Sequence, residues 1–163
     1  MRPDELLGLL RDFTIEKVGL KRRHEAGARL VGDYDFNNTY QYVINREEAH
    51  LDWLRRAIAG LGGTLPETIP EPEPPTTGKG RERQAAIIAD DVRLMDDAIA
   101  RWRGRIEQVN DSRQKLMLRV VIGEMLEQKR FFEQAAAGRE DLLGRRTSPS
   151  RPQGTVLSDR WVG

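Results

Sequence analysis

The sequence contains no cysteine, so disulfide bonds, zinc knuckles and thiol chemistry are excluded. It has no long apolar run either: no stretch approaches the roughly 20 apolar residues that span a bilayer. Neither charge is in excess: the formal net charge is +1. The sequence therefore gives no electrostatic reason to expect a nucleic-acid partner. The opening Met1-Arg2-Pro3-Asp4-Glu5 lacks the apolar stretch of a signal peptide. We therefore expect a soluble, cytoplasmic protein that binds neither nucleic acid nor membrane.

What the sequence does have is apolar residues at spacings of three and four, a pattern that predicts amphipathic helices. These stripes run from about Asp4 to Leu30, from Tyr34 to Ala59, from Arg81 to Val109 and from residue 112 to about Gly138. Gly32-Asp33 and Asn110-Asp111-Ser112 predict a turn within each pair, and Asp33 or Asp35 can cap the second helix. The fold class that we expect is all-α, a four-helix bundle made of two helical hairpins.

The segment that joins the two hairpins, residues 64–80, is rich in proline. Five of the eight prolines of the chain fall within it: Pro66, Pro70, Pro72, Pro74 and Pro75. It cannot be helical and should be extended at about 3.1 Å per residue, which reaches about 50 Å. A helix of some 26 residues is only about 40 Å long. The sequence thus predicts a long crossover that runs the length of a bundle formed by residues 1–140.

Carboxylates interrupt the apolar stripes, and one histidine accompanies them. Glu47 and His50 are three residues apart on the inner face of the second helix, one turn from each other. The other stripe positions are Glu16 on the first helix, Asp91 at the stripe edge of the third, and Glu124 and Glu127 on the fourth. Burying an unpaired carboxylate costs several kcal/mol, so five acids in one core suggest divalent cations. An oxygen-rich ligand set of this kind suits iron or manganese rather than a structural zinc.

These residues give the chain a resemblance to the ferritin-like superfamily of di-iron carboxylate proteins, which includes ferritins, bacterioferritins and rubrerythrins. The resemblance covers about Leu6 to Gln134. By this resemblance Glu16 matches the glutamate of the first helix, and Glu47 and His50 match the first Glu-x-x-His pair. Asp91 matches the glutamate of the third helix. Glu124 matches the glutamate of the fourth-helix pair, and Glu127 stands where rubrerythrins and bacterioferritins carry a second histidine.

The resemblance implies a carboxylate-bridged centre of two iron ions, or manganese, that oxidises Fe(II) or reduces oxygen or peroxide. It implies no catalytic residue beyond the metal ligands. It leaves iron storage, detoxification and oxidation of an organic substrate open. The sparse core also predicts further burial by association of identical chains into a homo-oligomer.

The alternative is a metal-free helical-bundle interaction module, in which the Glu-x-x-His pattern arises by chance. Its docking segment would be the C-terminal tail, residues 141–163. That tail joins a flexible basic linker to short apolar runs at Thr155-Val156-Leu157 and Trp161-Val162, which fit either a partner protein or the chain's own bundle. Of the remaining polar candidates, the sequence predicts His24 on a solvated charged face and Tyr40 as a core aromatic.

Overall fold

The computed structural model describes residues 1–70, 73–75, 78–139 and 142–143. All regular secondary structure within these ranges is helical: α1 (Pro3–Leu30), α2 (Tyr34–Gly60), α3 (Gly80–Glu107) and α4 (Ser112–Ala136). The all-α, four-helix prediction is confirmed, and each helix ends within about two residues of its predicted position. Of the predicted flexible docking tail, residues 141–163, only residues 142 and 143 are described, and Leu142 is buried against the bundle. The rest of the tail lies outside the described residues.

Two aspartates begin helices by accepting hydrogen bonds from otherwise unpaired backbone amides. The carboxylate of Asp33 accepts from the Phe36 N–H at 3.0 Å, and that of Asp111 accepts from the Gln114 N–H at 2.8 Å. These caps start α2 and α4 directly after the two short turns. Because each turn is short, the two helices that it joins pack side by side as an antiparallel hairpin.

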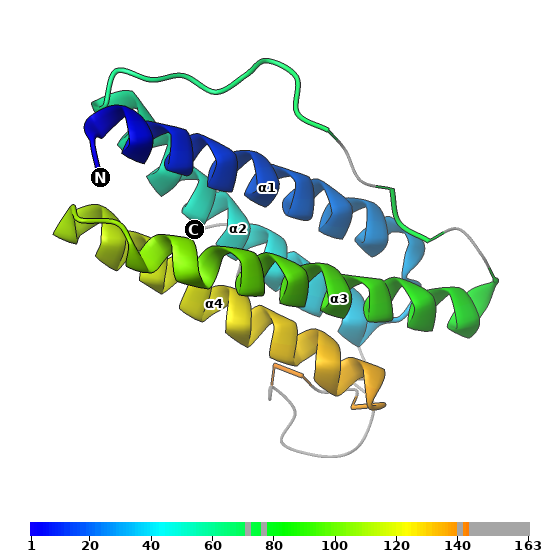
Figure 1. Ribbon diagram of the computed structural model, residues 1–163. Helices are drawn as coiled ribbons and strands as arrows, with labels where there is room; N and C mark the ends of the chain where they lie inside the picture. Colours follow the sequence, from blue (N-terminus) through cyan, green and yellow to red (C-terminus); the bar gives the residue numbers. More distant parts are fainter. Residues whose placement is uncertain (71–72, 76–77, 140–141, 144–163) are drawn as a thin grey trace.

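The two hairpins pack against each other around an interior that divides into two clusters. α1 packs most closely on α2 and α3 on α4, while α1–α3 and α2–α4 contacts join the hairpins (Figure 1). A large apolar cluster that includes Phe13, Leu54, Met95 and Trp102 fills one end. A second cluster, which includes Phe36, Tyr40, Ile87 and Phe132, fills the other. Burial of these faces is the main stabilising force, at about 25 cal/mol per Å².

The first part of the linker between α2 and α3, residues 64–70, follows the outside of α1 (Figure 1). Arg11 donates to the Thr64 carbonyl at 2.7 Å, and Arg22 donates to the Ile69 carbonyl at 2.8 Å. The α1 segment between these arginines rises about 16 Å at 1.5 Å per residue. Extended chain covers the same distance between Thr64 and Ile69, about 16 Å at 3.1 Å per residue. Two arginines of α1 thus hold this part of the linker against the helix.

The inner face of α4 differs from the predicted one. We expected Met117, Val120, Glu124, Glu127 and Phe131 to face the core. The buried residues are instead Leu118, Val121, Ile122, Met125, Gln128 and Phe132, while Val120 is 43% exposed. The apolar content of α4 is nearly continuous around these positions, so a shift of one residue, about 100° around the helix, satisfies the same periodicity.

None of the helices in the part of the chain that the structure describes combines the length and the apolar composition needed to cross a lipid bilayer.

Candidate functional site

Charged side chains of α1 enter the centre of the bundle. Lys17, Arg23 and His24 each have no solvent-exposed surface. The expectation that His24 lies on a solvated face is therefore wrong. Lys17 and His24 are seven residues apart, two helical turns, so both lie on the α1 face that carries Phe13 and Leu20. Ionised groups with no access to water need partners of opposite charge.

Glu47 of α2 supplies the first of these partners. Its carboxylate accepts from the Lys17 ammonium, with Nζ and Oε1 3.3 Å apart, and contacts the His24 ring, with Nδ1 and Oε2 2.9 Å apart. All three side chains are fully buried. The prediction that Glu47 points into the core is confirmed. Two cationic groups of α1 hold its carboxylate there.

Asp91 of α3 supplies the second partner, on the opposite side of His24. Its Oδ1 lies 3.7 Å from His24 Nε2 and 3.6 Å from Arg23 Nη1. Its Oδ2 accepts a hydrogen bond from the Tyr40 hydroxyl. Asp91 was expected at the edge of the α3 stripe, whereas it is completely buried. Lys17, Arg23, His24, Tyr40, Glu47 and Asp91 together form what we call the inner ion network.

A glycine makes room for part of this network. At Gly27 an added Cβ would lie 3.0 Å from Arg23 Nη1 and 3.2 Å from the Tyr40 hydroxyl oxygen. Because contacts below 3.4 Å force a neighbour to shift, a larger residue would displace the groups that face Asp91. The absence of a side chain at position 27 therefore lets α1 approach α2 and α3 at the level of Tyr40 and Asp91.

Burial and neighbouring groups of opposite charge act in opposite directions on the pKa of His24, Glu47 and Asp91. Burial disfavours the imidazolium form of His24, but the carboxylates of Glu47 and Asp91 outweigh burial and raise its pKa. Burial alone would raise the pKa of Glu47, whereas the cationic His24 and Lys17 lower it. Burial dominates at Asp91 and raises its pKa despite His24 and Arg23. Three cationic groups therefore face two carboxylates in the interior, and Asp90 adds a third carboxylate at the edge, with Oδ2 3.2 Å from Arg23 Nη2.

His50 and Glu124 form a second polar group, which joins α2 to α4. His50 Nε2 lies 2.7 Å from Glu124 Oε2, and Arg46 binds both oxygens of the same carboxylate at 2.6 and 2.8 Å. His50 is fully buried, whereas the side chains of Glu124 and Arg46 are 23% and 36% exposed. Burial and the charge of Lys17 lower the pKa of His50, and the Arg46 hydrogen bonds lower that of Glu124.

The remaining predicted ligands lie elsewhere. Glu16 lies at the α1–α3 contact, where its carboxylate accepts from Trp102 Nε1 at 2.6 Å and from Arg101 at 2.7 Å. Glu127 is on the exposed face of α4. Gln128, one residue later, is the buried polar residue of that helix, and neither of its amide atoms has a hydrogen-bond partner among the described residues.

This arrangement does not fit a centre of two metal ions. Within the described ranges, no three acid or imidazole side chains converge as ligands of one ion. The predicted ligands Glu47, Asp91, Glu124 and Glu16 each contact a lysine, arginine or histidine of the chain. Two divalent cations would have to displace these groups, and they would lie next to buried positive charges.

Sequence reasoning missed Lys17, Arg23, His24 and Gln128. A signal for Lys17 was available. The stripe of α1 reads Phe13, Glu16, Leu20 with spacings of three and four, or Phe13, Lys17, Leu20 with spacings of four and three. Both satisfy helical periodicity equally well. The prediction placed Glu16 inward, whereas charge balance with Glu47 favours Lys17.

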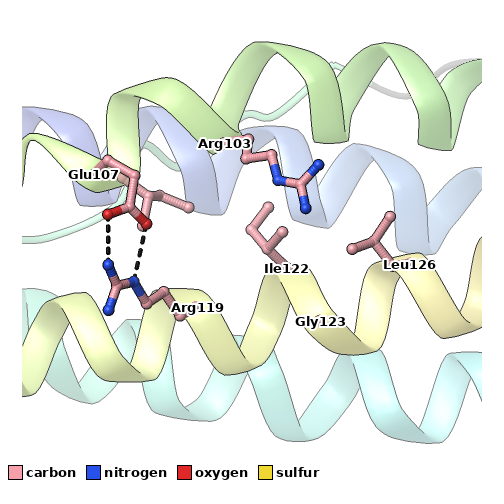
Figure 2. A pocket seen from close by; sticks show the side chains of 7 residues that line it. Arg103, Glu107, Arg119, Ile122, Gly123 and Leu126 are labelled. Carbon is pink, nitrogen blue, oxygen red and sulfur yellow. Dashed lines mark hydrogen bonds and ion pairs between the residues drawn. The ribbon is translucent and has the colours of Figure 1, made fainter.

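A shallow groove of about 250 Å³ lies on a different part of the bundle, between α3 and α4. Figure 2 shows Glu107 and Arg119 paired at one end of it and Leu126 at the other, with Ile122 and Gly123 between them. Arg119 Nε donates to Glu107 Oε1 at 2.9 Å. The groove contains none of the predicted metal ligands, so it is separate from the inner ion network.

The fold and the site define a class: a four-helix bundle whose interior carries an ion network drawn from α1, α2 and α3. Comparison of the chain with protein-family models, with curated protein sequences and with solved structures finds no match.

Proposed function

We propose that the chain is a ferritin-like four-helix bundle that functions without a two-metal centre, as an interaction module that docks to a protein partner through its C-terminal tail. The observation that carries the first half of this proposal is the inner ion network. The fully buried Lys17 and His24 contact Glu47, and Arg23 and Tyr40 contact Asp91. The acids that would bind metal are neutralised by the chain's own groups, so folding needs no bound cation.

The ferritin-like part of the proposal has two supports. The chain pairs α1 with α2 and α3 with α4, and residues 64–70 of its linker follow α1 on the outside of the bundle. Glu47 and His50 also occupy inner positions one turn apart on α2, which is the arrangement of a Glu-x-x-His pair. On this proposal the bundle keeps the architecture while cations of α1 replace the metal ions.

Metal independence gives the first test. Protein purified from iron-replete cells is expected to contain less than about 0.1 iron or manganese per chain. Its thermal midpoint is expected to change by less than about 1 °C with a chelator or with added Fe(II) or Mn(II), because a ligand stabilises a fold only if it binds the native state. Elemental analysis and calorimetry measure these quantities. About two irons per chain after anaerobic loading, lost in His50→Ala, would contradict the proposal.

The tail gives the second test. Deleting residues 155–163, which removes the apolar runs of the tail, is expected to abolish co-purification of the partner from cells that express the full chain. Glu47→Asp, which keeps the charge of the inner ion network, should leave that partner in place. A synthetic peptide of residues 150–163 should compete with the full chain for the captured protein. Capture that survives the deletion would assign docking to the bundle instead.

A second candidate function is the ferritin-like oxidation of Fe(II) by oxygen or peroxide at two irons. It requires Glu47, His50, Asp91 and Glu124 to exchange their present partners for iron, and Glu16 and Glu127 to turn inward. One observation favours it: His50 Nε2 and Glu124 Oε2 meet at 2.7 Å across α2 and α4, beside Glu47. The metal content measured above decides between the two candidates.

A further inference from the structure

One face of α4 exposes apolar side chains to solvent. Leu116 is 64% exposed, more than any other large apolar residue in the part of the chain that the structure describes, and Val120 is 43% exposed. Arg113, Leu116, Val120, Gly123 and Glu127 are all exposed and recur at spacings of three and four, so they form one stripe, which we call the outer α4 stripe. This spacing is the one with which a helix packs along a second helix.

The groove between α3 and α4 borders the outer α4 stripe (Figure 2). Gly123 belongs to both, and a Cβ added to it would meet no atom within 4 Å. The packing of the described residues therefore does not require a glycine at this position, although glycine weakens the interior of a helix relative to alanine. Ile122 and Leu126 line the groove beside Gly123, so the groove offers a place for an apolar side chain of another molecule.

The stripe carries one cation and one anion, one at each end. Neither Arg113 nor Glu127 forms an ion pair with any residue that the structure describes. The charge of Glu127 acts on Arg46, but the hydrogen bonds of Arg46 go to Glu124. Arg113 and Glu127 lie at equal distances on either side of Val120, about 10 Å along the helix at 1.5 Å per residue. A two-fold axis at Val120 would therefore bring Arg113 of each chain opposite Glu127 of the other.

We infer that the outer α4 stripe is the interface of a homodimer, in which the α4 helices of two identical chains pack antiparallel about a two-fold axis at Val120. On this axis Leu116 of each chain lies at the level of Gly123 of the other chain and packs over it, against the groove. A second copy fits the stripe because the stripe is self-complementary: its apolar centre faces itself, and its two opposite charges pair twice. The inference goes beyond the proposed function, because the tail takes no part in this interface.

Charge exchange tests the register of the two helices. Sedimentation velocity of the full chain between about 1 μM and about 1 mM should show a monomer–dimer equilibrium, as expected of a small interface. Arg113→Glu and Glu127→Arg each place like charges opposite one another at both ends, so each should weaken self-association at least about tenfold. An equimolar mixture of the two variants should dimerise as tightly as the wild type, because both unlike pairs are then restored. Arg56→Glu, on an exposed residue of α2, should behave as the wild type does.

A single cysteine tests the position of the axis. The chain contains no cysteine, so Val120→Cys introduces the only thiol. The two thiols of a dimer then face each other, and oxidised glutathione should link the chains through a disulfide. Ala59→Cys, on an exposed residue of α2, should remain unlinked under the same conditions. Val120→Lys places two ammonium groups at the axis and should abolish self-association, while circular dichroism shows an intact fold because Val120 is already exposed.

Deletion of residues 155–163 separates this inference from the proposed function. Self-association that survives the deletion and is lost in Val120→Lys supports the interface, whether or not the tail captures a partner. Self-association that Val120→Lys leaves intact, or that the mixture of charge variants does not restore, overturns it. A full chain that stays monomeric at about 1 mM also overturns it. If that monomeric chain dimerises after the deletion, the stripe is covered by the chain's own tail instead.

Discussion

Replacing Glu47 by glutamine is expected to lower the free energy of unfolding by about 3–5 kcal/mol, the cost of leaving a buried charge without its partner. Glutamine keeps the shape of the side chain but removes the negative charge that faces Lys17 and His24, both fully buried. Urea denaturation at pH 7, followed by circular dichroism, measures the loss. A loss below about 1 kcal/mol would mean that the ion pairs contribute little to folding.

Glu48→Gln is the matched control for this variant. Glu48 is the next residue along α2, its side chain is 51% exposed, and it pairs with Lys21 at the surface. Because exposed ion pairs contribute about 0–1 kcal/mol, its loss should be correspondingly small. The double variant Lys17→Met, Glu47→Gln should lose less than the sum of its single variants, by at least about 1 kcal/mol, since the two groups contact each other.

Replacing Trp102 by alanine is expected to cost about 3–5 kcal/mol, as is typical of a buried tryptophan. Trp102 is 2% exposed and packs edge to face on Phe13, with ring centroids 4.9 Å apart. Its removal leaves a cavity in the larger apolar cluster and also removes the indole donor that binds Glu16. Thermal and urea denaturation measure the loss.

Trp102→Phe separates the two contributions. It retains an aromatic ring against Phe13 but removes the N–H that donates to Glu16, so the expected loss is about 1–2 kcal/mol. If Trp102→Ala cost no more than Trp102→Phe, packing would not be the larger contribution. If Glu16 instead served as a metal ligand, its substitution would change metal content; as a partner of Trp102 and Arg101 it should change stability alone.

The inner ion network and a metal centre solve the same physical problem in different ways. Carboxylates in a helical core must be neutralised, either by cations from solution or by cations of the chain. A bound metal makes stability depend on its concentration. Lys17, Arg23 and His24 make the neutralisation part of the covalent chain, at the cost of placing three cationic groups in the interior. The protein is therefore expected to fold under metal-poor conditions.

The sequence by itself determined the local structure. Spacings of three and four gave the four helices, Asp33 and Asp111 gave two of their starts, and the prolines excluded helix from the linker. It also placed Glu47 and His50 on the inner face of α2, because the apolar residues of that helix leave a single narrow stripe. All of these depend on interactions within about one helical turn, which the order of residues contains.

Only the tertiary structure decided which of two adjacent residues of a helix faces the core. On α1 Glu16 and Lys17 both fit between Phe13 and Leu20, and on α4 Glu127 and Gln128 are one residue apart beside a broad apolar surface. Turning a helix about its axis by the angle of one residue leaves its backbone hydrogen bonds and its helix propensity unchanged. Packing against the other helices therefore sets which face of the helix is buried. The pairing of Glu47 with Lys17 and His24 depends on that rotation. Because of these contacts between helices, Glu47 and Asp91, which the sequence predicted as metal ligands, form ion pairs with the cations of α1 instead.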